Sequence, residues 1–270
     1  MLYRLKLSYK GTNYIGWQIQ EKQGRTIQGE LMKALGKICK LSGEELGQIK
    51  IIGSGRTDTG VHSFGQVARI EIPLKIDPRS LRSALNSNLD FDIRILEAHD
   101  CDESFHPLRD SKSKEYWYVF ANLDNAPPHA RELMSNFPFE IDVELMKKGA
   151  KLFEGTHDFC NYFCTGTEVS TTVRTIYECE LVHHKSSGLW NFYVPDYYVL
   201  RIKGNGFLKQ MVRLIMGALW NLGRGKITLS QLEESLRQPI PKKLGMTAPP
   251  QGLYQMYVEY PSLSQGIDKN

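Results

Sequence analysis

The sequence predicts an α+β protein built from two similar halves. Segments with alternating apolar residues, which are typical of strands, are interspersed with segments in which apolar residues recur at helical spacing. The order of these segments in the first half is repeated in the second, although no direct sequence repeat is visible. Of the 270 residues, 41% are hydrophobic and 24% are charged, so the composition is that of a globular protein with one large or two ordinary domains.

The first half begins with a strand over residues 2–9, in which every odd-numbered position from 3 to 9 is apolar. A helix capped by Thr26 follows and stops near Ser42-Gly43, because the apolar residues between them recur at helical spacing. Apolar residues over 49–52 and an alternating run over 67–72 then predict two strands joined by a long loop.

A short helix and a further strand complete the first half. Asp77 and Pro78 supply an N-cap and a first-turn proline for the helix, and residues 93–98 form the strand. The resulting order, β-α-β-β-α-β, is that of a ferredoxin-like fold.

The second half repeats this plan and adds helices near its end. Asp142 caps one helix, and Thr228 with Gln231 forms a capping box at the start of another. The longest helix is predicted from about Asn205 to Leu222. The predicted strands cover residues 116–121, 175–182, 198–203 and 253–260.

Polar residues and a proline interrupt the apolar pattern between residues 105 and 114. We therefore expect an N-terminal α+β half over residues 1–106, a C-terminal α+β half over residues 107–262, and a flexible tail over residues 263–270. Two such halves side by side would form a cleft between their sheets.

The loop over residues 54–66 carries more functional side chains than a turn requires. Arg56, Asp58 and His62 lie within seven residues, among glycines that permit tight backbone geometry. An Asp-x-Gly sequence alone is most often a turn in which the Asp side chain binds its own backbone. Asp58-Thr59-Gly60 also matches the motif of aspartic proteases, but such an enzyme needs two of these aspartates and this chain has one copy of the motif.

The predicted helix over residues 205–222 places a charge among apolar residues. It has no wide polar face, so it should be largely buried, yet it contains Arg213. A buried Arg needs an acidic partner, because an unpaired buried charge costs several kcal/mol. The residues alone leave open whether this partner belongs to a structural salt bridge or to an active site.

Seven segments, in order along the chain, resemble the motifs of the tRNA pseudouridine synthase A (TruA) family. The segment from Gly55 to His62 resembles the active-site signature of that family. The other six segments cover residues 9–18, 26–31, 115–118, 155–159, 207–217 and 248–253. Together the seven segments span nearly the whole chain, so the resemblance is specific.

The resemblance implies a pseudouridine synthase fold, in which the two ferredoxin-like halves form a mixed, mostly antiparallel sheet with a central RNA-binding cleft. It also implies three catalytic residues. Asp58 would be the nucleophile, Arg213 its charge partner, and Tyr116 the aromatic platform for the target uracil. Further substrate-binding residues implied by the resemblance are Arg56, Phe105, His106 and Leu253.

The implied reaction converts uridine to pseudouridine at positions 38, 39 and/or 40 of the tRNA anticodon stem-loop, and members of the family act as homodimers. No cofactor is expected, because the reaction involves no redox step, hydrolysis or phosphate activation. The alternative is a non-catalytic RNA-binding module, which two ferredoxin-like halves would also fit. The segment from Phe105 to Arg109 departs from the family pattern, so we expect a basic RNA contact there to be displaced or lost.

Composition permits an RNA partner without requiring one, since 34 basic against 30 acidic residues give a pI of only about 8.7. Five cysteines without disulfide-like spacing, and an N-terminus unlike a signal peptide, favour the cytoplasm and no membrane association. His157, Cys160 and Cys164 are spaced too loosely for a usual zinc site, so we expect free thiols and no metal.

Overall fold

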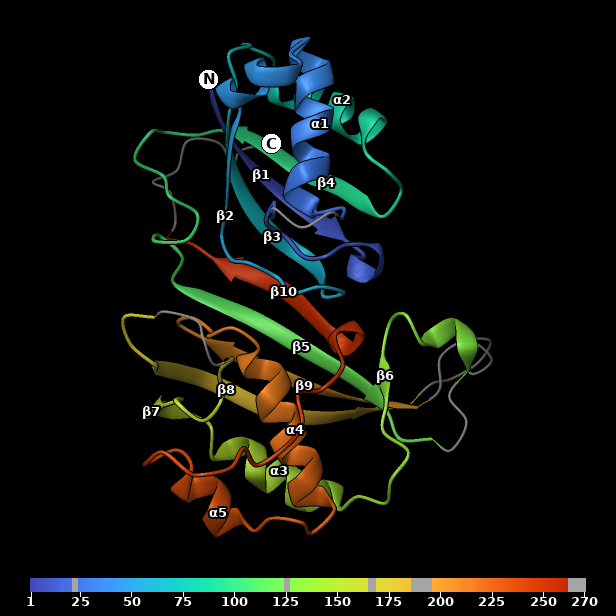
Figure 1. The fold of residues 1–270 in the computed structure, drawn as a ribbon, viewed down its shortest axis with the longest axis vertical. Coiled ribbons are helices and arrows are strands. Elements are labelled where there is room, and N and C mark those ends of the chain that lie inside the picture. Colours follow the sequence, from blue (N-terminus) through green and yellow to red (C-terminus); the bar gives the residue numbers. More distant parts are fainter. Residues whose placement is uncertain (21–23, 124–126, 165–168, 186–195, 262–270) are drawn as a thin grey trace, which may run out of the picture. The chain divides into compact units, whose positions relative to one another are not determined.

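The structure is a computed structural model, which describes residues 1–20, 24–123, 127–164, 169–185 and 196–261. The chain divides into two compact units. The first consists of Met1–Ser113 together with the chain from Gln255 onward, and the second of Lys114–Tyr254. Each unit combines helices with paired strands, which confirms the α+β class (Figure 1).

The first unit contains the predicted β-α-β-β-α-β order. Its elements are β1 (Leu2–Tyr9), α1 (Ile27–Cys39), β2 (Lys50–Gly53), β3 (His62–Glu71), α2 (Pro78–Asn88) and β4 (Ile93–Asp100). β1 pairs antiparallel with both β3 and β4, and β2 pairs antiparallel with the second half of β3. Two 3-10 helices, η1 (Gly11–Asn13) and η2 (Gly43–Gln48), lie in the connections.

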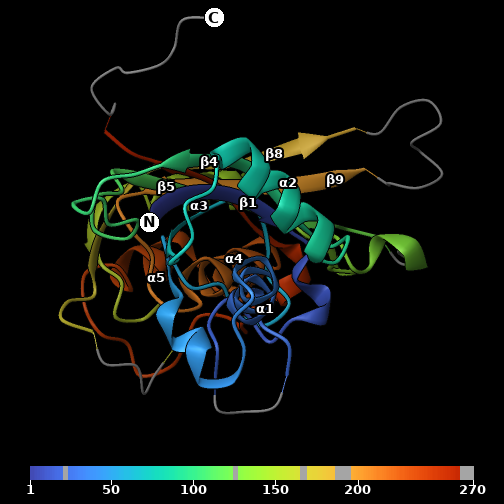
Figure 2. The same cartoon turned by 90° about the horizontal axis from the view of Figure 1, so that it is seen from above.

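Helices α1 and α2 pack on one face of these strands. The alternate residues of β1, from Tyr3 to Tyr9, are at most 3% exposed, and they share an apolar cluster with Leu31 of α1 and Leu81 of α2. Burying each leucine side chain stabilises the unit by about 1.5–3 kcal/mol. Figure 2 shows α1 on one side of β1 and β4, so the loop between β2 and β3 is attached to a well-packed support.

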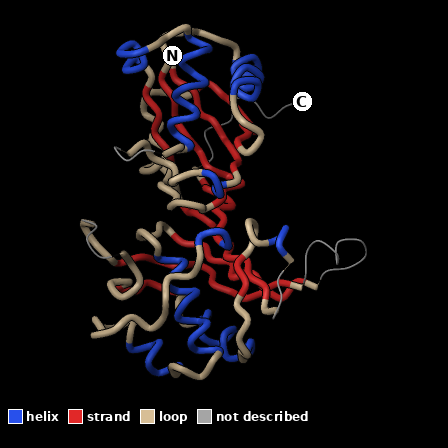
Figure 3. The backbone as a smooth tube through the Cα atoms, turned by 45° about the vertical axis from the view of Figure 1, so that its right-hand side comes forward, coloured by secondary structure: helices blue, strands red, loops and turns tan. Residues whose placement is uncertain are grey.

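The second unit is also an α+β arrangement, and its strands form one layer in the tube drawing of Figure 3. Its elements are β5 (Ser113–Ala121), η3 (Pro128–Ala130), β6 (Ser135–Asn136), α3 (Val143–Lys151), β7 (Gly155–Asp158), β8 (Val173–His184), β9 (Tyr197–Gly204), α4 (Met211–Gly223), α5 (Leu229–Glu234) and η5 (Pro250–Gly252). β9 pairs antiparallel with β5 and β8, and β8 pairs antiparallel with β7. Because β6 runs parallel to β5, the pairing is mixed but mostly antiparallel, as predicted.

The last strand, β10 (Leu253–Glu259), crosses the division between the units, which falls between Tyr254 and Gln255. In the first unit, the Ser63 hydroxyl of β3 donates a hydrogen bond to the Gln255 carbonyl at 3.1 Å. The C-terminal strand is therefore part of the support of β3.

Four helix starts predicted from capping residues are confirmed. The side-chain oxygens of Thr26, Asp77, Asp142 and Thr228 each accept a hydrogen bond from a backbone N–H in the first turn of the helix that follows. These contacts explain why α1, α2, α3 and α5 begin where they do.

The predicted start of the longest helix is wrong, because α4 begins at Met211 and not at Asn205. Gln210 has a left-handed backbone, with φ of 63°, which no helix can continue through. Asn205 remains bound to β8, where it exchanges two hydrogen bonds of 3.0 Å with the backbone of Thr175. Arg213 consequently lies in the first turn of α4 and not in its middle.

Candidate active site

Asp58 lies in the loop between β2 and β3 of the first unit. Its side chain is half-buried, whereas the preceding Thr57 is buried and Arg56 is exposed. The side chains of Arg56 and Asp58 are therefore accessible to solvent, whereas the side chain of Thr57 between them is covered.

The backbone on both sides of Asp58 is bound to the segment between β1 and α1. The Trp17 N–H donates a hydrogen bond to the Thr57 carbonyl at 3.1 Å, and the Gly60 N–H donates one to the Tyr14 carbonyl at 3.2 Å. Asp58 thus lies between two fixed backbone positions, which is the support that a catalytic side chain needs.

Tyr9 and Gly16 complete this support. The Tyr9 hydroxyl lies 2.9 Å from the Thr57 hydroxyl, and burial raises the pKa of Tyr9, so the phenol keeps its proton. Gly16 has φ of 113°, and a Cβ there would lie 2.6 Å from the Thr57 carbonyl oxygen. Only glycine satisfies both the backbone conformation and this close approach.

Polar side chains also hold the two ends of the loop. The Ser54 hydroxyl donates to the Gln66 side-chain oxygen at 2.6 Å, and the Gln66 amide donates to the Gly55 carbonyl at 2.9 Å. His62 is buried, and its Nδ1 accepts a hydrogen bond from the Gly11 N–H at 3.0 Å. His62, which the sequence suggested as a functional side chain, is therefore positioned to stabilise the loop.

Sequence reasoning did not single out Tyr9, Gly16 and Gln66 as supports of the loop. Tyr9 and Gly16 lie within a segment that resembles a family motif, but nothing in that pattern says which residue they contact. Gln66 could have been noticed as a polar residue between the loop and the apolar part of β3, where it is fully buried.

Tyr116 lies on β5 in the second unit and is 8% exposed. Its ring makes an edge contact with Phe207, with ring centroids 4.9 Å apart. The two other aromatic residues beside it on β5 have different surroundings. Tyr118 is fully buried in the core. Trp117 is half-buried, and the guanidinium of Arg201 lies over its ring. Tyr116 is thus an aromatic ring at the margin of the core.

Arg213 is half-buried, and its Nε donates a hydrogen bond to the Ala248 carbonyl at 2.7 Å. The Ala248 N–H donates in return to the Arg213 carbonyl at 3.1 Å, and the Tyr118 hydroxyl donates to the adjacent Pro249 carbonyl at 2.8 Å. Burial raises the pKa of Tyr118, and the nearby positive charge of Arg213 partly offsets this effect. Residues 248–249 therefore join α4 to β5 next to the charged group.

The other predicted substrate-binding residues lie in different surroundings. Leu253 is 6% exposed at the first position of β10. Phe105 is buried in a small cluster with Val67 and Val258, and the Nδ1 of His106 accepts two backbone N–H groups from the turn that follows it. Substrate contacts by Leu253, Phe105 and His106 stay predictions.

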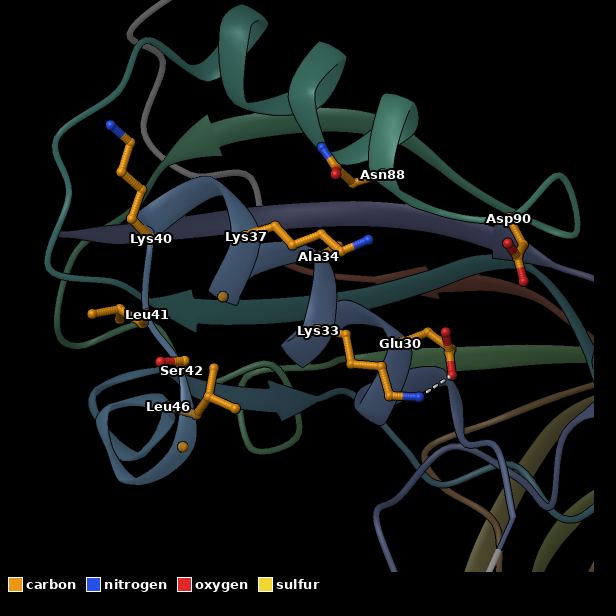
Figure 4. Close-up of a pocket in the computed structure, with 12 residues that line it drawn as sticks. Glu30, Lys33, Ala34, Lys37, Lys40, Leu41, Ser42, Leu46, Asn88 and Asp90 are labelled. Atoms are coloured by element: carbon orange, nitrogen blue, oxygen red, sulfur yellow. Dashed lines mark hydrogen bonds and ion pairs between the residues drawn. The ribbon is translucent and has the colours of Figure 1, made fainter.

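A shallow pocket of about 510 Å³ lies beside α1 in the first unit (Figure 4). Lys33, Lys37 and Lys40 line it together with Glu30 and Asp90, and Lys33 pairs with Glu30 at 3.0 Å. Its charges are of both signs, and it contains none of the predicted site residues. It is therefore not the candidate active site.

Two further observations concern metals and membranes. In the part of the chain that the structure describes, no three His, Cys, Asp or Glu side chains are grouped so that they could hold a metal ion. The five cysteines are free thiols. Among the described helices, none combines the length and the apolar character that crossing a bilayer requires.

Comparison with known proteins assigns the chain to a family. A family model described as tRNA pseudouridine synthase matches residues 7–107 and 150–261, which include Asp58, Arg213 and Leu253. The tRNA pseudouridine synthase A of Thermoanaerobacter sp. (strain X514) is 38% identical over 254 residues, covering 94% of this chain and 97% of the relative. The protein of that name from Bacillus pumilus (strain SAFR-032) is 39% identical over 260 residues, covering 96% and 99%. With matches of this extent, the chain belongs to the tRNA pseudouridine synthase family.

Proposed function

We propose that this chain isomerises uridine to pseudouridine in tRNA, with Asp58 as the nucleophile. The reaction and the substrate class follow from the family and from the names of its relatives. The observation that best supports Asp58 as the nucleophile concerns the backbone on either side of it. Thr57 and Gly60 both form backbone hydrogen bonds with the segment between β1 and α1. A nucleophile oriented before the substrate arrives loses less entropy in the reaction.

The chemistry rearranges bonds within one nucleotide. The N1–C1′ glycosidic bond breaks, the uracil turns, a C5–C1′ bond forms, and the proton at C5 is exchanged for one at N1. Asp58 attacks C1′ or C6, or assists formation of a glycal intermediate. Because uridine and pseudouridine are isomers, the reaction consumes no oxidant, reductant or water.

The other site residues have distinct proposed roles. Arg213 would pair with the Asp58 carboxylate and keep it ionised, as an opposite charge nearby favours the charged form. Tyr116 would stack on the flipped uracil, and Leu253 would form the apolar wall of the uracil pocket. Arg56, which is exposed, would contact the phosphates of the flipped nucleotide.

The finer identity of the substrate is also a proposal. We propose positions 38, 39 and 40 of the anticodon stem-loop as targets, read mainly through backbone shape, with Phe105 and His106 near the RNA. We further propose a cytoplasmic homodimer, for which light scattering should give about twice the 30.9 kDa mass of one chain. A mass of one chain at micromolar concentration would contradict the dimer.

The experiment is pseudouridine mapping on unmodified tRNA transcripts, by carbodiimide labelling and primer extension, without added cofactor. Wild-type protein should produce new stops at positions 38 to 40, and Asp58→Asn should produce none. The matched control is Asp100→Asn, because Asp100 is an exposed aspartate at the end of β4 in the same unit. This control should retain wild-type activity.

Each outcome separates one part of the proposal from the rest. Stops elsewhere in the tRNA would keep the chemistry and change the target. Activity in Asp58→Asn would remove Asp58 as the nucleophile. RNA binding by wild-type protein without any stops would contradict the proposed reaction and favour a binding module.

A further inference from the structure

The buried face of β5 carries a lysine next to Tyr116. Residues two apart on a strand share a face, so Lys114 and Tyr116 point to the same side of the sheet. That side is the one on which α4 packs, since Tyr118, on the same face, contacts the Trp220 ring with centroids 5.7 Å apart. Lys114 is nevertheless only 7% exposed, which is unusual for a lysine.

Strand pairing places Arg174 on the same face. Lys114 on β5 pairs with Gly204 on β9, which pairs in turn with Ile176 on β8. Directly paired residues share a face, and Arg174 lies two positions before Ile176, so Lys114 and Arg174 both point to this side. Gly204 between them has no side chain, and a Cβ there would lie 3.4 Å from the ring of Phe207.

The two cations lie near each other and near the aromatic pair formed by Tyr116 and Phe207. Burial, together with a smaller effect of the charge of Arg174, lowers the pKa of Lys114 to about 8. Gly206, next to Phe207, is also close to Arg174, because a Cβ at Gly206 would lie 3.8 Å from the Arg174 Nε.

No carboxylate neutralises Arg174 within the described residues. Its Nη1 donates to the carbonyls of Thr171 and Val173 at 2.9 and 2.6 Å, and these two contacts orient the guanidinium without cancelling its charge. Burial lowers the pKa of Arg174 as well. The partly desolvated charge of Arg174 is therefore one that an anion would stabilise.

We propose that Lys114 and Arg174 form a binding site for one phosphodiester of the RNA substrate, next to the nucleotide that Tyr116 receives. This site deepens the proposed function and depends on it for the identity of the RNA. Lys and Arg are the side chains that bind phosphate oxygens most strongly, and contacts of this kind set the register of RNA without reading its sequence. The site would therefore position the target nucleotide and leave its sequence context free.

The test measures the affinity of an anticodon stem-loop RNA over a range of KCl concentrations. Each lost phosphate contact should make the dependence of log K on log salt about one unit less steep. Arg174→Gln and Lys114→Met should each raise Kd about tenfold at low salt and show this reduced slope. Arg174→Lys keeps the charge and should retain most of the slope, which separates loss of the contact from loss of folding.

Arg201→Gln is the matched control, because it also removes one positive charge from a strand of this sheet. Arg201 lies on β9 on the opposite face, where it pairs with Glu180 at 3.0 Å. Its Kd and slope should stay within about twofold of wild type. An equal reduction in Arg201→Gln would overturn the proposal, since the effect would then be a general loss of charge.

Pseudouridine mapping on the same samples separates this inference from the proposed function. Modified RNA with unchanged salt slopes in both variants would overturn the phosphate site alone. Reduced slopes in both variants without any pseudouridine from wild-type protein would support the phosphate site and contradict the proposed reaction. Failure of wild-type protein to bind the RNA would overturn both.

Discussion

Tyr3 and Tyr9 are two buried tyrosines on the same face of β1 with different partners. The Tyr9 hydroxyl meets the Thr57 hydroxyl beside Asp58, whereas the Tyr3 hydroxyl donates to the Ile76 carbonyl at 2.9 Å. Both side chains are at most 3% exposed. Removing one hydroxyl at a time therefore separates support of the fold from support of the candidate nucleophile.

Tyr9→Phe should slow single-turnover pseudouridine formation about tenfold, because Thr57 loses a partner and Asp58 its fixed position. Tyr3→Phe should leave that rate within about twofold, while both variants lose about 1 kcal/mol of unfolding free energy in urea. Rates are measured with saturating tRNA. Equal rates in the two variants would mean that the hydroxyl of Tyr9 contributes only to stability.

At the scale of elements, β5 shows both the strength and the limit of the sequence pattern. Its buried positions alternate, with Tyr116, Tyr118 and Phe120 on one face, although residues 116–121 are all apolar and show no alternation in the sequence. Lys114 occupies the same face, but the predicted strand begins at residue 116, so the sequence did not place this lysine on a buried face. What the sequence could not show is Arg174 on the same face, because that follows from the register of β5 with β9 and of β9 with β8.

Lys114 should make the stability of the protein depend on pH. Its pKa falls from 10.5 in the unfolded chain to about 8 in the folded protein. Between these values the folded protein binds fewer protons at this site, so the free energy of unfolding rises with pH. The destabilisation is complete below about pH 8 and disappears above about pH 10.5.

Lys114→Met should therefore be more stable than wild type at pH 7, by up to about 3 kcal/mol, although it binds RNA less well. The difference between the two proteins should shrink as the pH approaches 10.5. Urea unfolding of both proteins across this range, without RNA, measures the effect. A constant difference would show that the charge of Lys114 is not the cause.

Helix ends illustrate which local features a sequence reveals. Thr26, Asp77, Asp142 and Thr228 were recognised because capping depends on a few adjacent residues. The start of α4 was not, since the left-handed Gln210 has no glycine or proline to announce it. The short strands β6 and β7 were also missed, because two to four residues carry too little periodicity.

At the scale of the whole molecule, the candidate site residues were predicted one by one and not as an arrangement. Asp58 was found because its motif is contiguous, and Arg213 because a charge in an apolar helix is conspicuous. Asp58 belongs to the first unit, whereas Tyr116, Arg213 and Leu253 belong to the second. Contacts between residues far apart in sequence depend on the fold, which the resemblance supplied and the residue pattern could not.

The end of the chain packs into the first unit. From Gln255 onward, β10 belongs to this unit, and Val258 packs against Val67 and Phe105. The Lys112 N–H donates to the Glu259 carbonyl at 2.8 Å, and Gly65 of β3 passes so close to β10 that a Cβ would lie 2.4 Å from the Met256 carbonyl oxygen. A fragment ending at Ser113 would expose these groups to water.

We therefore expect the fragment Met1–Ser113 to melt about 10 °C or more below the same fragment joined through a flexible glycine-serine linker to residues 255–261. The linked fragment with Val258→Asp is the control, because it restores the strand but buries a charge where Val258 packs. It should melt close to the unlinked fragment. Circular dichroism on heating measures all three, and equal melting of the linked and unlinked fragments would show that residues 1–113 need no strand from the C-terminus. The loop that carries Asp58 would then be supported by contacts within residues 1–113 alone.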